Sequence, residues 1–248
     1  MKLEGKKVIV TGGSQGMGYA TAQAFVAEGA KVAIMDIKDD LGQKSAELAN
    51  SQGSGSAKFY HANVSNRSEI ESAFAAAVED MGGLDVLVNV AGVQRRKAAE
   101  DLTDEDLDFV LNTNLRGTII TNQTAFKFMH QNGGTILNFG SDAGLAPMPL
   151  LGAYSASKGG VMAWNRTIAG EWARYGIRAN SVVPAIATPM TGAGGEAGQA
   201  IYSGVPLGGK LGDATRDFAP VMVFLASDDA RFITGQIISV NGGLVMSR

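Results

Sequence analysis

Short apolar runs alternate with longer helical patterns along almost the whole chain. Several runs are continuously apolar, as in parallel strands that are covered on both faces. The expected strands are Lys7–Thr11, Lys31–Asp36, Ala57–His61, Val86–Asn89, Thr135–Phe139, Arg178–Val183 and Ile237–Val240. The expected helices include Met17–Glu28, Arg67–Met81, Asp104–His130 and Tyr154–Tyr175. This order predicts one α/β domain over residues 1–248, a doubly wound and mostly seven-stranded parallel sheet with helices on both faces.

A Gly-rich stretch, Thr191–Gly212, interrupts this pattern late in the chain. It contains eight glycines and has no clear periodicity. Such a stretch predicts a loop or short helices within the one domain, because nothing in it could form a separate core.

Composition narrows the class of protein. The 248 residues carry a net charge of −3 without basic blocks, so we expect no nucleic acid and no anionic membrane as partner. No apolar run approaches the roughly 20 residues that span a bilayer, and the first apolar stretch ends at Val10, too early for a signal peptide. With no cysteine and only His61 and His130, no metal site is expected. These features predict a cytoplasmic, soluble protein.

The first expected strand leads into a Gly-rich turn with the spacing G-x-x-x-G-x-G. A helical pattern follows directly, so backbone N–H groups and a helix N-terminus can approach a pyrophosphate. The turn predicts a dinucleotide site whose residues include Gly12, Ser14, Gln15, Gly16, Met17 and Gly18.

Asp36 ends the second expected strand, twenty residues after Gly16. A carboxylate at this point can accept hydrogen bonds from both hydroxyls of an adenosine ribose, and it repels the extra phosphate of NADP. The flanking Gln15 and Ile37 offer no positive charge to that phosphate, although Lys38 is close. We therefore expect NAD as cofactor, with NADP less favoured; the alternative is that Asp36 caps the next helix.

Two further segments follow expected strands and are predicted to contact the cofactor. Asn89, Ala91 and Gly92 come after the fourth strand, where small residues leave room for a ligand at the carboxyl edge of a parallel sheet. Asn63 and Val64 come after the third strand and could contact adenine. Asn63 could equally be a turn residue.

Tyr154 and Lys158 are four residues apart, which places both side chains on one face of a helix. A tyrosine has an unperturbed pKa of about 10, and a nearby ammonium lowers it by favouring the phenolate. The pair can therefore act as a proton donor and acceptor. The alternative is an ordinary solvated helix face.

Two further polar residues stand out in the sequence. Ser141 follows the fifth expected strand, thirteen residues before Tyr154, and Asn114 interrupts a long helical pattern. Taken with the motifs above and the segment Pro184–Thr188, the chain resembles the classical short-chain dehydrogenase/reductase family along essentially its whole length. The resemblance implies a Rossmann fold and an NAD(H)-dependent enzyme that interconverts a secondary alcohol and a ketone.

The resemblance also implies a role for each residue. Tyr154 would be the general acid or base, and Lys158 would bind the nicotinamide ribose and lower the tyrosine pKa. Ser141 would hold the substrate oxygen, and Asn114 would hold a water beside Lys158. Pro184, Ile186 and Thr188 would contact the cofactor. A flexible substrate lid would lie at about residues 190–212.

Three positions depart from the family pattern. Val90 replaces the second asparagine of Asn-Asn-Ala-Gly, Asn63-Val64 replaces Asp-Val, and Pro184-Ala185 replaces Pro-Gly. These changes concern contacts to the cofactor and leave the four candidate catalytic residues intact.

Apolar residues dominate the expected substrate wall, which favours a small apolar or cyclic alcohol or ketone. They are Leu145, Met148, Leu150, Leu151 and Met190. Gln94-Arg95-Arg96 is an exception, because an arginine there could bind a substrate carboxylate, as in relatives that act on sugar acids. The alternative is that these arginines are solvated or pair across a subunit interface.

Other functions remain open from the sequence. The family also reduces 3-oxoacyl thioesters, although Asp36 opposes the NADPH that such enzymes usually prefer. A non-catalytic, NAD-binding regulator would have no physical need for all four candidate catalytic residues. Family resemblance further implies a homotetramer that packs through the long helices.

Overall fold

The computed structural model describes residues 1–192 and 203–246. Seven strands form one parallel sheet in the order β3-β2-β1-β4-β5-β6-β7. The strands are β1 (Lys7–Thr11), β2 (Lys31–Asp36), β3 (Ser56–His61), β4 (Val86–Asn89), β5 (Gly134–Phe139), β6 (Ile177–Pro184) and β7 (Ile237–Val240). The predicted sheet is confirmed, with strand ends that differ from the expected ones by at most one residue.

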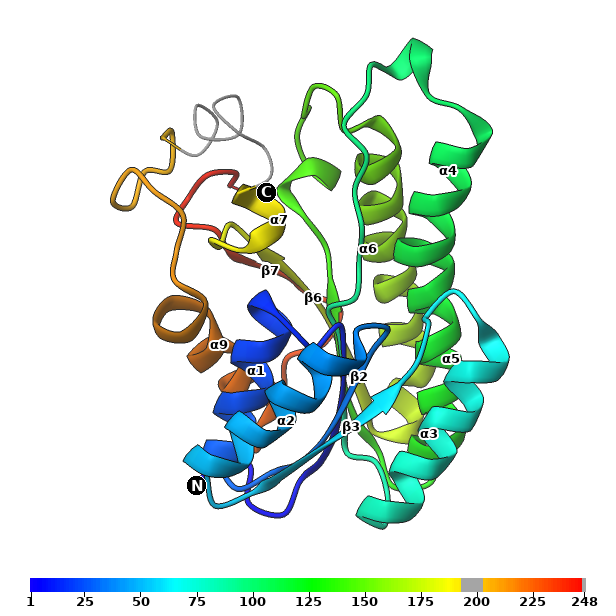
Figure 1. Ribbon diagram of the computed structural model, residues 1–248, viewed down its shortest axis with the longest axis vertical. Helices are drawn as coiled ribbons and strands as arrows, with labels where there is room; N and C mark the ends of the chain where they lie inside the picture. The colour runs from blue at the N-terminus through cyan, green and yellow to red at the C-terminus, as the bar shows by residue number, and fades with distance from the viewer. Residues whose placement is uncertain (193–202, 247–248) are drawn as a thin grey trace.

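Helices cover both faces of the sheet (Figure 1). One face carries α1 (Gly16–Ala27), α2 (Asp39–Gln52) and α9 (Ala219–Ala226). The other face carries α3 (Arg67–Met81), α4 (Asp104–Leu111), α5 (Gly117–Met129) and α6 (Gly152–Trp172). The short α7 (Pro189–Gly192) follows β6.

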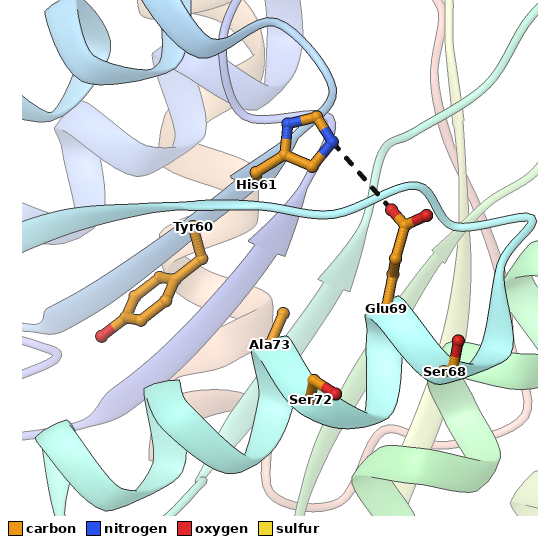
Figure 2. Close-up of a pocket in the computed structure, with 6 residues that line it drawn as sticks. All are labelled: Tyr60, His61, Ser68, Glu69, Ser72 and Ala73. Atoms are coloured by element: carbon orange, nitrogen blue, oxygen red, sulfur yellow. Dashed lines mark ion pairs between the residues drawn. The ribbon is translucent and has the colours of Figure 1, made fainter.

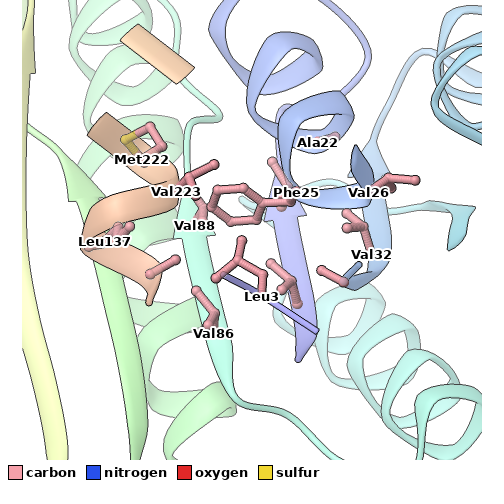
Figure 3. Packing of buried hydrophobic residues seen from close by; sticks show 14 of the residues in the cluster. Leu3, Ala22, Phe25, Val26, Val32, Val86, Val88, Leu137, Met222 and Val223 are labelled. Atoms are coloured by element: carbon pink, nitrogen blue, oxygen red, sulfur yellow. The ribbon is translucent and has the colours of Figure 1, made fainter. Parts of the chain in front are cut away.

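Two apolar clusters fill the space between the sheet and its helices. In the first, Phe25 of α1 and Met222 of α9 pack with Val86 and Val88 of β4 (Figure 3). In the second, Phe74 of α3 packs within the cluster that joins the opposite sheet face to α5 and α6. The strands are buried on both sides, which explains why their sequences are continuously apolar.

The sequence predicted one continuous helix over Asp104–His130, but the structure divides this stretch into two α-helices. A capping box between Thr103 and Asp106 starts α4, but residues Asn112–Arg116 form a π-helical turn before α5 begins. A π-turn widens a helix locally and often marks a functional position. Asn114 lies in this turn and is fully buried.

The strand order reverses between β1 and β4, which creates the crevice where doubly wound sheets bind ligands. The loops after these strands, the π-turn and the start of α6 all border this edge. Part of the predicted lid, residues 193–202, lies outside the described residues. No helix in the described part of the chain is long and apolar enough to cross a membrane.

Candidate active site

The Gly-rich turn after β1 is shaped so that side chains would not fit. Gly12 has a φ of +69°, and a Cβ on it would lie 2.6 Å from the backbone nitrogen of Ala91. A Cβ on Gly18 would collide with the carbonyl of Gly12. At Gly16, with a φ of +57°, the nearest atoms belong to Thr188, 3.5 Å from the Cβ position. The turn is therefore a backbone cradle at a helix N-terminus, which fits the pyrophosphate of a dinucleotide.

The carboxylate of Asp36 faces this cradle. It accepts hydrogen bonds from the backbone N–H of Ser14 at 3.2 Å and from the Ser14 hydroxyl at 2.5 Å. The N-cap of α2 is Lys38, whose backbone N–H donates to Oδ1 of Asp36 at 3.2 Å, so Asp36 precedes the cap of that helix and is not the cap itself. The ammonium of Lys38 donates a hydrogen bond to the side-chain oxygen of Gln15 at 3.1 Å. An acceptor therefore stands ready at the carboxyl end of β2, where the adenosine ribose of a dinucleotide would bind.

Tyr154 and Lys158 lie one turn apart on α6. The ammonium of Lys158 is 5.8 Å from the centre of the Tyr154 ring and donates to the carbonyl oxygen of Phe139 at 2.8 Å. The Lys158 side chain is only 4% exposed, so this face of α6 is not a solvated one. Burial lowers the pKa of Lys158 to about 8, because the charged form is poorly solvated.

Asn114 joins the π-turn to the loop after β4. Its amide accepts from the Val93 N–H at 2.8 Å and donates to the Val93 carbonyl at 2.8 Å. The same amide donates to the hydroxyl of Ser157 at 3.0 Å, and Ser157 donates to the Tyr154 carbonyl at 2.7 Å. Asn114 therefore ties the middle of the π-turn to the loop after β4 and to α6.

The polar side-chain ends of Asn114 and Lys158 both lie next to Gly92. A Cβ on Gly92 would lie 3.2 Å from Oδ1 of Asn114 and 3.6 Å from Nζ of Lys158. The absence of a side chain at Gly92 leaves this polar corner open beside the cofactor cradle.

Ser141 lies just past the end of β5. It caps a short 3₁₀ turn, Asp142–Gly144, by accepting from the Ala143 N–H at 3.2 Å. That bond uses a lone pair and leaves the hydroxyl proton available to a substrate oxygen. The structure thus brings Ser141, Tyr154 and Lys158 to the same edge of the sheet, with Asn114 behind them.

The other predicted cofactor residues occupy this edge too, some in structural roles. The side chain of Asn63 accepts from the Ser65 N–H at 3.0 Å and so forms a turn. Val64 packs against Gly117 at the start of α5. Ile186 is 2% exposed and belongs to the core, while Pro184 ends β6.

Asn89 belongs to a buried polar network that sequence reasoning missed. It accepts from the hydroxyls of Thr11 and Thr121 and donates to Asn138 at 2.9 Å. Asn138 in turn bonds Asn165 of α6 at 3.1 Å. The network crosses from β1 through β4 and β5 to α6, so it fixes the strands that present Ser141 relative to the helix that carries Tyr154 and Lys158. Asparagines spaced this far apart give no sequence signal.

The arginine pair after β4 divides into two environments. Arg95 is exposed, lies 3.7 Å from the carboxylate of Asp106 and stacks 4.1 Å from the ring centre of Phe109. Arg96 is half-buried and makes no hydrogen bond or ion pair with the described residues. Gln94 donates to the Met190 carbonyl at 3.4 Å.

Among the other residues predicted for the substrate wall, Leu151 is buried, Leu145 and Met148 are half-buried, and Leu150 and Met190 are exposed. The isolated bridge between Lys97 and Leu151 joins this wall to the loop that carries Arg96.

A separate depression lies between β3 and α3, lined by Tyr60, His61 and Glu69 (Figure 2). His61 is 4.0 Å from Glu69 and 2.7 Å from Asp39. None of the four candidate catalytic residues lines this depression, so it is not the site of the proposed chemistry.

The chain is similar to known proteins over nearly its whole length. A family model described as enoyl-(acyl carrier protein) reductase matches residues 12–245. The 3-oxoacyl-[acyl-carrier-protein] reductase of Thermotoga maritima is 38% identical, over 99% of this chain and 100% of that protein. The trans-4-hydroxycyclohexanecarboxylate dehydrogenase of Sinomonas cyclohexanicum is 37% identical, over 96% of this chain and 92% of that protein. The crystal structure of levodione reductase superposes with a TM-score of 0.93 at 30% identity, over 97% of this chain and 98% of that one.

The chain belongs to the short-chain dehydrogenase/reductase family, as its motifs predicted. It is an oxidoreductase of that family, and the fold implies a nicotinamide cofactor.

Proposed function

We propose that the protein is an NAD(H)-dependent oxidoreductase that interconverts a secondary alcohol and a ketone. The observation that carries the proposal is the buried ammonium of Lys158 beside the ring of Tyr154. A buried positive charge is costly, and among the described residues this one has no carboxylate partner. Stabilisation of the tyrosinate and binding of the ribose hydroxyls would offset this cost.

Each residue then has a defined task. The nicotinamide, when bound, supplies or accepts the hydride. Tyr154 donates a proton to the carbonyl oxygen during reduction and takes it back during oxidation. Ser141 donates a hydrogen bond to the same oxygen and holds it at the reacting position. Asn114 keeps the Val93 loop and α6 in register and, we propose, holds a water that relays protons past Lys158.

The preference for NAD rests on Asp36. Its carboxylate stands at the end of β2 and already accepts two hydrogen bonds from Ser14. A 2′-phosphate at this place would meet the same negative charge, and the ammonium of Lys38 is engaged with Gln15. The relative that acts on a 3-oxoacyl thioester shows that this fold serves such substrates, but Asp36 favours NADH-linked chemistry here.

A carboxylated cyclic alcohol or ketone is a second candidate substrate. Arg96 favours it, because its half-buried guanidinium has no partner among the described residues and a bidentate carboxylate would satisfy it. The relative named for hydroxycyclohexanecarboxylate supports this chemistry in a protein of 37% identity.

Turnover of a matched pair of ketones distinguishes the two candidates. NADH consumption is measured with cyclohexanone and with 4-oxocyclohexanecarboxylate, each against a blank without protein. Turnover of both supports an apolar pocket, and turnover of the carboxylate alone supports the Arg96 candidate. Absence of turnover across a wide panel of ketones and secondary alcohols, despite NADH binding, would contradict the proposal and favour an NAD-binding regulator.

We also propose that the protein is a homotetramer, with the long helices at subunit contacts. Light scattering at micromolar concentration should give four times the 25.7 kDa of the chain. A single-chain mass would contradict the homotetramer without affecting the proposed chemistry.

A further inference from the structure

Asp142 directly follows Ser141 and is almost fully buried, with 4% of its surface exposed. Its side chain accepts a 2.7 Å hydrogen bond from the amide of Asn241, which lies 99 residues further along the chain. Its backbone carbonyl accepts from the N–H groups of Leu145 and Ala146 at 2.9 Å each. Asp142 is therefore held at both ends, and it closes the turn that presents Ser141.

Asn241 has one orientation available to its amide. The oxygen accepts from the Gly243 N–H at 3.0 Å, and the nitrogen donates to the Val245 carbonyl at 2.8 Å as well as to Asp142. Because the oxygen faces the following turn, the nitrogen faces the carboxyl group. Asn241 is itself only 4% exposed.

The turn at residues 241–243 also contacts the segment at residues 205–207. The Leu207 N–H donates to the Gly242 carbonyl at 2.9 Å, and a Cβ on Gly242 would lie 2.6 Å from a methyl group of Val205. The serine turn, the turn at residues 241–243 and the segment at 205–207 are thus joined through one buried pair of side chains, Asp142 and Asn241.

We infer that Asp142 and Asn241 are positioning residues that hold the hydroxyl of Ser141 at the place where it meets the substrate oxygen. The inference rests on the proposed function, since it requires Ser141 to bind that oxygen. Burial raises the pKa of Asp142 to about 6, so an ionised carboxyl is costly here, and the Asn241 amide is the group that offsets the cost. An apolar residue would fill the space without this cost but could not bind the Asn241 amide.

Two changes at Asp142 test the inference. Asp142→Leu removes the acceptor of the Asn241 amide, so the turn that presents Ser141 should lose its anchor. Asp142→Asn keeps an oxygen that can accept from the Asn241 amide, so this variant should stay close to wild type. Glu79→Gln, an exposed change on α3, is the control for loss of one negative charge.

The expected result is specific to the chemical step. Asp142→Leu should lower kcat for the ketone about 10-fold or more, with KM and the Kd for NADH within about 2-fold of wild type. Asp142→Asn should keep kcat within about 3-fold of wild type, and Glu79→Gln should change nothing. If the wild-type protein itself has no turnover, the proposed function is wrong; this outcome is separate from a failure of the inference, which is read from the variants.

Three results would overturn the inference. They are an unchanged kcat in Asp142→Leu, a folded Asp142→Asn that is as slow as Asp142→Leu, and a loss of NADH affinity equal to the loss of kcat. If Asp142→Leu does not fold, Asn241→Ala removes the donor from the other side of the pair. The same kcat loss at unchanged NADH affinity would then support the inference, and an unchanged kcat would overturn it.

Discussion

The ammonium of Lys158 donates a 2.8 Å hydrogen bond to the carbonyl oxygen of Phe139, the last residue of β5. This bond connects α6, which carries Tyr154 and Lys158, to the strand that presents Ser141. It also places a buried positive charge at the edge of the sheet where the Gly-rich turn lies.

Lys158→Met should stabilise the protein while it removes turnover. The folded pKa of about 8 lies below the usual lysine value of 10.5 that applies to the unfolded chain, so the buried charge destabilises the fold at pH 7. Replacing it with an apolar side chain should raise the free energy of unfolding by about 1 to 3 kcal/mol. Urea unfolding measures this, with the exposed Lys44→Met as control. A destabilised Lys158→Met would mean that the bond to Phe139 outweighs the burial of charge.

The same pKa sets a pH dependence of stability. Between pH 8 and 10.5 the unfolded state binds more protons at Lys158 than the folded state, so this residue makes stability rise with pH over that window. The rise amounts to about 3 kcal/mol for the full shift. The difference in unfolding free energy between wild type and Lys158→Met should therefore shrink as the pH increases from 8 to 10.5. A constant difference would contradict the lowered pKa.

Asp36→Ser should relax the choice of cofactor. Without the carboxylate, the ribose loses an acceptor for both hydroxyls and the 2′-phosphate no longer meets a negative charge. We expect the Kd for NADH to rise about 10-fold and that for NADPH to fall, measured by fluorescence titration. Asp40→Ser, an exposed change on α2, should leave both constants unchanged. Unaltered discrimination in Asp36→Ser would place the selectivity elsewhere.

Gly92→Ala should impair the site without disturbing the fold. The added Cβ would lie 3.2 Å from Oδ1 of Asn114, which the Val93 backbone holds in place. We expect kcat/KM to fall about 10-fold with an unchanged circular dichroism spectrum. Gly170→Ala on α6 meets nothing within 4 Å and is the matched control. Equal activity of the two variants would show that Gly92 does not border the reacting groups.

Arg96→Ala should raise KM at least 10-fold for a carboxylated ketone and leave an uncharged one unaffected, if the second candidate substrate is correct. Arg95→Ala is a close control, because Arg95 already contacts Asp106 and Phe109. An equal effect of Arg96→Ala on both ketones would exclude Arg96 as a carboxylate ligand.

The sequence predicted the sheet and the Gly-rich turn after β1 well, because both follow from local patterns. Apolar runs define strands such as β4, and glycines are needed where a Cβ would collide, as at Gly12 and Gly18. The burial of Lys158 was not predictable in this way, since it depends on the carbonyl of Phe139, nineteen residues earlier.

Long-range contacts explain what the sequence could not predict. The π-turn at Asn112–Arg116 looks like ordinary helix in the sequence, and it is stabilised by the bonds between Asn114 and Val93. The pair Asp142 and Asn241 joins positions 99 residues apart, and neither residue alone suggests the other.

Comparing wild type with Tyr154→Phe shows whether Tyr154 transfers the proton in a ketone reduction. NADH oxidation is measured with a cyclic ketone that the wild type reduces, and NADH affinity is measured for both proteins. We expect kcat to fall at least 100-fold in Tyr154→Phe while the Kd for NADH changes less than about 3-fold, because only the phenolic hydroxyl is lost. If Tyr154→Phe keeps most of the wild-type kcat, Tyr154 is not the proton donor.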